Sequence, residues 1–139
     1  MRLVVDTNLL ISALLSEKSL PAHLLGLWRA GQFDLLTSTE QLDELRRVTR
    51  YPKIRARLSP VLAGRLVNEV RDLAVLIVDL PDVVVSPDPD DDYLLAMASA
   101  GKADFLLTGD KRDILALRVY DGVKIITVRA FLVMQGIMP

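Results

Sequence analysis

Four acidic residues, each in a different stretch of the chain, are the strongest candidates for chemistry. They are Asp6, Glu44, Asp91 and Asp110. Carboxylates that converge in a fold repel one another and raise each other's pKa unless a cation lies among them. Because no cysteine or histidine accompanies these four, a site built from them favours a hard ion, Mg²⁺ or Mn²⁺.

Metal ions held by carboxylates suit the hydrolysis of a phosphodiester, because they activate a water and neutralise charge on the phosphate. Other hydrolytic arrangements lack residues here. The only histidine, His23, lies among apolar residues of a predicted helix, so neither a two-histidine ribonuclease nor a Ser-His-Asp triad fits. A P-loop and a glycine-rich dinucleotide turn are also missing from the sequence. A metal-dependent nuclease is the interpretation that these observations favour.

Each acidic residue also has an ordinary structural interpretation. Asp6 could cap the helix that follows it, Glu44 could be an exposed helix residue, and Asp110 could belong to a plain turn. Most charges of the acid-rich turn that contains Asp91 would then be solvated or favourable at a helix N-terminus. In that turn Asp91 and Asp92 are alternatives for the same role, and the spacing to later apolar residues favours Asp91.

The composition predicts one domain over residues 1–139, which we expect to be soluble and cytoplasmic. A chain of this length can bury a core without disulfides. The absence of cysteine excludes a thiolate zinc site and fits a reducing compartment. The first apolar run is interrupted at Asp6, too early for a signal peptide or a membrane span. A net charge of -1 gives no global attraction to nucleic acid, so affinity for phosphate must be local.

The elements that must position the acids are alternating strands and helices. Apolar runs predict strands at 3–5, 33–37, 105–108 and 123–128, with a further β-rich stretch at 83–85. Helical spacing and caps predict helices at 9–15, 19–31, 38–52, 59–77, 94–101 and near the C-terminus, with a capping box at Ser38 and Gln41. This alternation predicts an α/β domain: a parallel sheet of about five strands with helices on both faces.

Ligands of such sheets bind outside the carboxyl ends of the strands. Asp6 directly follows the predicted strand 3–5, and Asp110 closely follows the strand 105–108. A mean hydropathy of +0.32 agrees with strands that are buried on both faces. We therefore expect the four acids to converge at one edge of the sheet.

Four short motifs cover nearly the whole chain in order. They are residues 4–8 (Val-Val-Asp-Thr-Asn), 44–48 (Glu-Leu-Arg-Arg-Val), 88–92 (Asp-Pro-Asp-Asp-Asp) and 107–111 (Leu-Thr-Gly-Asp-Lys). In these motifs the chain resembles the PIN-domain family (PilT N-terminus nucleases), in particular VapC-like toxin components of toxin-antitoxin systems. The resemblance implies a PIN-like fold with catalytic, metal-binding acids at Asp6, Glu44, Asp91 and Asp110. It implies supporting roles for Asn8, Thr108, Asp92 and Asp113.

The resemblance further implies an endoribonuclease that uses Mg²⁺ or Mn²⁺ and leaves 5′-phosphate and 3′-hydroxyl ends on RNA. It also implies a homodimer and a protein antitoxin with a segment that blocks the site. The apolar residues of the first two helices agree with a dimer, because they look too numerous for the inner faces of two short helices. These residues are Leu9, Leu10, Leu14, Leu15, Leu24 and Trp28.

A basic stretch over residues 46–57 contains six Arg or Lys residues and no acid. We expect Arg46, Arg47 and Arg50 to contact RNA phosphates, although a solvated helix face would have the same composition.

Two other classes compete with the nuclease. A non-catalytic PIN-like binding module would keep the fold, but intact acids at all four positions argue against it. A phosphoacceptor receiver domain shares the layout, but paired acids typically follow its first strand, whereas Thr7 and Asn8 follow Asp6 here.

Overall fold

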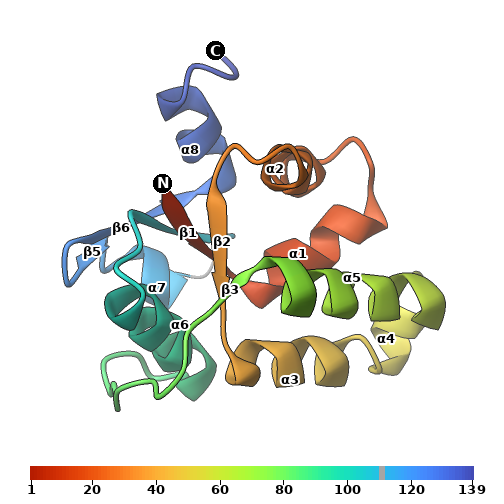
Figure 1. Ribbon diagram of the computed structural model, residues 1–139, viewed down its shortest axis with the longest axis horizontal. Helices are drawn as coiled ribbons and strands as arrows, with labels where there is room; N and C mark the ends of the chain where they lie inside the picture. The colour runs from red at the N-terminus through yellow and green to blue at the C-terminus, as the bar shows by residue number, and fades with distance from the viewer. Residues whose placement is uncertain (110–111) are drawn as a thin grey trace.

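A mostly parallel sheet forms the centre of the computed structural model, which describes residues 1–109 and 112–139 (Figure 1). The described strands lie in the order β3-β2-β1-β4-β6-β5, and only β5 is antiparallel to its neighbour. They are β1 (Arg2–Val5), β2 (Asp34–Thr37), β3 (Val75–Leu76), β4 (Phe105–Thr108), β5 (Val119–Tyr120) and β6 (Val123–Thr127). The α/β prediction is confirmed, with six strands in place of about five. The two strands that the sequence did not predict, β3 and β5, have two residues each, too few to produce a periodic pattern.

Helices cover both faces of the sheet, as the alternating pattern predicted (Figure 1). The described helices are α1 (Thr7–Leu15), α2 (Leu20–Arg29), α3 (Thr39–Val48), α4 (Pro52–Arg55), α5 (Pro60–Leu73), α6 (Pro89–Ala100), α7 (Arg112–Leu115) and α8 (Val128–Met134). None of the described helices is both long enough and apolar enough to cross a membrane.

Two hydrophobic cores lie on opposite faces of the sheet, because successive strand residues point to opposite sides. In β1, Leu3 and Val5 join the core that α1, α2, α3, α5 and α8 cover, whereas Val4 joins the core beneath α6 and α7. All three side chains are at most 2% exposed. The central strand is therefore fixed from both sides, and so is the position of the residue that follows it.

Several predicted helix and strand boundaries were wrong, in stretches where the same local sequence pattern is compatible with more than one secondary structure. The helix predicted over 59–77 ends at Leu73, and Val75–Leu76 forms the edge strand β3. The β-rich stretch 83–85 forms no strand and pairs with none of the described strands, and Val84 is 92% exposed. Pro52 does not end α3 but begins α4, where its fixed φ suits the first helical turn.

The apolar residues of α1 and α2 are largely used within the chain. Leu10, Leu24 and Trp28 are buried in the first core, and Leu9, Leu14 and Leu15 pack partly against it. The sequence argument for a dimer, that these side chains exceed the space inside, was therefore wrong for the buried three. The dimer itself stays a prediction.

Candidate active site

Asp6 lies at the point where the order of the strands reverses. From β1 the chain continues to β2 and β3 on one side of the sheet, whereas β4 and β6 lie on the other side. Such a switch point leaves a crevice outside the carboxyl ends of the strands, where α/β proteins bind ligands. The residue after β1, Asp6, therefore lies at this switch point.

Among the described residues, Asn8 and Thr108 donate hydrogen bonds that hold the Asp6 carboxylate in place. Its Oδ1 accepts a hydrogen bond from the backbone N–H of Asn8 at 3.2 Å, which makes Asp6 the N-cap of α1. Its Oδ2 accepts from the hydroxyl of Thr108, at the end of the adjacent strand β4, at 2.9 Å. Asp6 is 1% exposed. The ordinary interpretation of Asp6 as a cap is therefore correct as far as it goes, but a helix cap alone does not require burial at the switch point.

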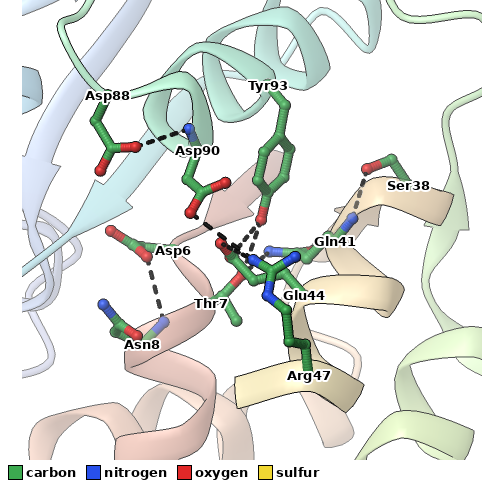
Figure 2. Close-up of polar contacts among 10 residues, drawn as sticks. All are labelled: Asp6, Thr7, Asn8, Ser38, Gln41, Glu44, Arg47, Asp88, Asp90 and Tyr93. Carbon is green, nitrogen blue, oxygen red and sulfur yellow. Dashed lines mark hydrogen bonds and ion pairs between the residues drawn. The ribbon is translucent and has the colours of Figure 1, made fainter.

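Glu44 reaches the same region from α3 through a chain of hydroxyl groups. The Tyr93 hydroxyl donates to Glu44 Oε1 at 2.6 Å, and it lies 2.9 Å from the hydroxyl of Thr7. When Tyr93 donates its single proton to the charged Glu44, Thr7 is the donor in the bond between Thr7 and Tyr93. Figure 2 shows Tyr93 extending from α6 toward Glu44 on α3 and Thr7 on α1. Three helices far apart in sequence are joined by these hydrogen bonds, which the sequence analysis missed.

Burial changes the protonation of both partners. The pKa of Glu44 is raised chiefly because the protein desolvates the carboxylate, and the nearby Asp90 adds to the rise, while the hydroxyls of Thr7 and Tyr93 oppose it. Burial and the hydrogen bond to Glu44 likewise raise the pKa of Tyr93, so this residue keeps its proton. Glu44 is thus an acid whose charge is more costly than usual and which a neutral donor holds in one orientation.

Arg47 pairs with the acidic site itself. Its Nη2 lies 3.8 Å from Glu44 Oε2 and 3.8 Å from Asp90 Oδ2, and Figure 2 shows it between these two carboxylates. Glu44 and Arg47 are three residues apart on α3, a spacing that places them on one helix face. The guanidinium is half exposed, so the pair contributes little to stability, but it supplies positive charge beside the carboxylates.

The carboxylates of the acid-rich turn, residues 88–92, have different hydrogen-bond partners and different burial. Asp88 caps α6 by accepting from the backbone N–H of Asp90 at 2.9 Å. Asp92 Oδ1 accepts from the backbone N–H groups of Val85 and Ser86, at 3.1 and 2.8 Å, and so fixes the preceding loop. Asp91 is 2% exposed, and its Oδ2 accepts from the Ser86 hydroxyl at 3.3 Å. Asp91 therefore occupies the buried position and Asp92 the loop-binding position.

Gln41 ties α3 to the end of β1. Its Nε2 donates to the carbonyl oxygen of Val5 at 2.7 Å, and its Oε1 accepts from the Thr37 hydroxyl at 2.9 Å. Ser38 caps α3 as predicted, because its hydroxyl accepts from the backbone N–H of Gln41. The returning half of the predicted capping box is absent, since the fully buried Gln41 side chain is used to fix the strand beside Asp6.

A family model described as PIN domain matches residues 2–112 of this chain. The chain belongs to the PIN-domain family. It has no significant match among curated proteins or among solved structures. PIN domains are typically nucleases and generally bind divalent metals. The family that the four motifs resemble is confirmed, and the match gives no support to the receiver-domain alternative; the VapC-like toxin role stays a prediction.

The remaining predicted residues of this PIN domain lie in different surroundings. Asp110 lies outside the described residues. Asn8 is exposed and contributes its backbone N–H to Asp6. Asp113 is exposed in the first turn of α7, and no interaction within the described part of the chain links it to Asp6, Glu44 or Asp91.

The donor set of this PIN domain fits a divalent cation in its chemistry. Asp6 and Asp91 are buried carboxylates, α6 packs against β1, and oxygen ligands suit Mg²⁺ or Mn²⁺. Burial of carboxylate charge is costly unless hydrogen bonds or a cation stabilise it. Among residues 1–109 and 112–139, no three acidic, histidine or cysteine side chains lie close enough together to hold a metal ion. The described residues thus supply metal-binding groups rather than a complete coordination shell.

Proposed function

We propose that this PIN domain is a metal-dependent endoribonuclease that hydrolyses RNA phosphodiester bonds. The observation that carries the proposal is the buried, doubly hydrogen-bonded carboxylate of Asp6 at the switch point of the sheet. The buried carboxylate of Asp91, in the first turn of the helix that packs on β1, supports it.

The proposed roles follow from the surroundings of each residue. Asp6, Asp91 and Asp110 would hold Mg²⁺ or Mn²⁺, which when bound supplies an activated water and neutralises phosphate charge. Thr108 fixes the orientation of Asp6. Glu44 would bind metal or orient the attacking water.

Two side chains beside Glu44 would assist without reacting. The Tyr93 hydroxyl holds one oxygen of Glu44 and leaves the other oriented toward Arg47. The half-exposed guanidinium of Arg47 can exchange its carboxylate partners for an RNA phosphate, since guanidinium groups form strong paired hydrogen bonds with phosphate oxygens.

The test compares RNA cleavage by the wild type and by Asp6→Asn, with Mn²⁺ and with EDTA. Asparagine keeps the shape and can still cap α1, and Thr108 can accept as well as donate a hydrogen bond, so the fold should be retained. We expect Asp6→Asn to lose activity by about a hundredfold or more. Asp34→Asn is the matched control, because Asp34 is exposed at the N-terminal end of β2, whereas Asp6 follows the C-terminal end of the neighbouring strand β1. Cleavage that persists in EDTA, or in Asp6→Asn, would contradict the proposal.

The toxin role is a separate part of the proposal. The motif resemblance supports a ribonuclease toxin that acts as a homodimer and is blocked by a protein antitoxin. Expression of the wild type, but not of Asp6→Asn, should then arrest bacterial growth. Light scattering should give twice the chain mass of 15.4 kDa. A harmless wild type that cleaves RNA in vitro would remove the toxin role and leave the nuclease, and a monomer at all concentrations would remove the dimer.

One observation favours the non-catalytic module as a second candidate. Arg47 supplies positive charge to Glu44 and Asp90 in the structure, as a purely structural cluster would require. The same assay distinguishes the two, because a binding module would cleave no RNA with either metal ion.

A further inference from the structure

A cavity of about 310 Å³ lies between α3, α4 and α5. Figure 1 shows α5 lying alongside α3, with α4 at the end of the pair that is farther from α6. Three arginines line the cavity, namely Arg46, Arg50 and Arg55. Thr49 and Asn68 add polar groups to its walls. None of the described lining residues is acidic or aromatic.

The geometry of α3 separates this cavity from the acidic site. Arg46 lies in the last turn of α3 and Arg50 directly follows the C-cap residue Thr49, whereas Arg47 is rotated about 100° from Arg46, toward the face of Glu44. Arg47 accordingly pairs with acids, and the other two line the cavity. The basic stretch of the sequence therefore contributes side chains to two separate sites, the acidic site and the cavity.

The positive charge at the cavity is largely uncompensated. Within residues 1–109 and 112–139, Arg50 and Arg55 form no ion pair and no side-chain hydrogen bond, and Arg46 has only an exposed pair with Asp43 at 3.2 Å. Guanidinium groups match the oxygens of a phosphate with paired hydrogen bonds. A cavity with arginines on its walls and no acid favours an anion of this kind.

Gly64 keeps one wall of the cavity open. It lies in the middle of α5, where glycine is less favourable than alanine, and a Cβ built on it would meet no heavy atom within 4 Å. A side chain at this position would extend into open space at the cavity wall. The position therefore offers a way to fill the cavity without changing its charge.

We propose that this cavity binds a backbone phosphate of RNA, at a place separate from the acidic site. The proposal rests on RNA being the substrate, as proposed above. A sugar-phosphate backbone fits better than a free nucleotide, because the described walls offer no aromatic surface on which a base could stack. Glu44 and Arg50 are six residues apart on α3 and its end, about 9 Å along the helix axis, so one strand can reach both places.

The experiment measures binding of a short, fluorescently labelled single-stranded RNA in EDTA, where no metal-dependent cleavage occurs. The test variant is Arg50→Gln/Arg55→Gln. Each phosphate interaction that the variant removes should reduce the slope of log affinity against log salt by about 0.7, which is about fivefold in affinity at about 0.1 M salt. The control is Arg65→Gln/Arg129→Gln, which removes the same charge from exposed arginines that do not line the cavity. We expect the control to bind within about twofold of the wild type.

A second variant tests the cavity rather than the charge. Gly64→Leu should weaken RNA binding at least as much as the removal of one phosphate interaction, while the melting temperature is not lowered. An equal loss of affinity in the charge control would mean that only the general field acts, and unchanged binding by Gly64→Leu would mean that RNA does not enter the cavity. Either result would overturn the proposal.

Inorganic phosphate distinguishes the source of the anion. We expect phosphate to compete with RNA no better than chloride at equal ionic strength, because an RNA phosphate gains affinity from the rest of the strand. Strong protection against melting by phosphate, without competition for RNA, would overturn the proposal in favour of a small-anion site. The two proposals fail in different ways. If the nuclease proposal is wrong, the wild type binds RNA without cleaving it. If the cavity proposal is wrong, the wild type cleaves RNA and the cavity variants bind RNA as tightly as the wild type.

Discussion

The protonation of Glu44 depends on individual neighbours rather than on the net charge of the site. Desolvation raises its pKa, whereas the Tyr93 hydroxyl lowers it by donating a hydrogen bond to the charged form. A bound divalent cation would favour the charged form more strongly than any hydroxyl. Substitutions of Glu44 and Tyr93 therefore test this pair without an RNA substrate.

Glu44→Gln should make the protein more stable in EDTA at neutral pH. Because the folded pKa lies above the ordinary value of 4.5, the folded protein holds a proton that the unfolded chain has released, over the interval between the two pKa values. Wild-type stability therefore falls as pH rises through that interval, and the cost persists above it. Melting curves from about pH 4 to about pH 8 should show the advantage of glutamine at high pH and its loss near the acid end. The exposed Glu17→Gln is the control, and equal curves at every pH would contradict the inferred burial of charge.

Tyr93→Phe should cost about 1–2 kcal/mol of unfolding free energy, because Glu44 loses a donor and Thr7 an acceptor. Urea unfolding measures this loss. Tyr120→Phe is the control, since no hydrogen bond of its hydroxyl occurs among the described residues. If the two variants unfold at the same urea concentration, the hydroxyl chain does not hold the three helices together.

The position of α6 relative to the sheet depends on close packing at its C-terminal end. A Cβ on Gly101 would lie 2.6 Å from Leu36 Cδ1 and 3.1 Å from Ile77 Cδ1, so this glycine allows α6 to approach β2 and the chain after β3. The same helix presents Asp91 and Tyr93 at its other end. Packing at one end of α6 thus helps to fix the site at the other.

Gly101→Ala should destabilise the protein by about 1–3 kcal/mol through overpacking. Gly64→Ala is the matched comparison, because its Cβ meets nothing, and it should stabilise α5 by about 0.5–1 kcal/mol. Thermal unfolding of both variants checks the pair. Opposite signs are expected, and a Gly101→Ala variant as stable as the wild type would mean that the side chains of Leu36 and Ile77 make room for the methyl group and that the position of α6 does not depend on this glycine.

The whole molecule should respond to metal through mass action. A cation that binds only the folded protein stabilises it by about 2.7 kcal/mol at a hundred times its dissociation constant, which is roughly 10 °C in melting temperature for a chain of this size. Differential scanning fluorimetry with Mn²⁺ and with EDTA measures the rise. In Asp6→Asn the rise should shrink, while melting in EDTA stays at or above that of the wild type. Identical melting of both proteins with and without Mn²⁺ would contradict the metal site.

Features that depend on local patterns could be predicted from the sequence. The run before Asp6 has the apolar character of a buried strand. The helix starts at Ser19, Ser38 and Ser59 were predictable because a serine N-cap bonds to a backbone N–H only three residues later in the chain. From alternating strands and helices the parallel sheet follows, because crossover connections have one handedness. The place of Asp6 outside a strand end was therefore predictable.

Contacts between side chains that are distant in the sequence could not be predicted in this way. Tyr93 and Glu44 are 49 residues apart, and Gln41 and Val5 are 36 apart, so no spacing in the sequence relates them. Arg46 and Arg47 belong to the same basic stretch of the sequence, but they lie on different faces of α3. Arg46 lines the cavity, whereas Arg47 pairs with Glu44 and Asp90. Val75–Leu76 became a strand because β2 offered an unpaired edge. In each case the outcome depends on what packs against the residue, and local periodicity does not contain that information.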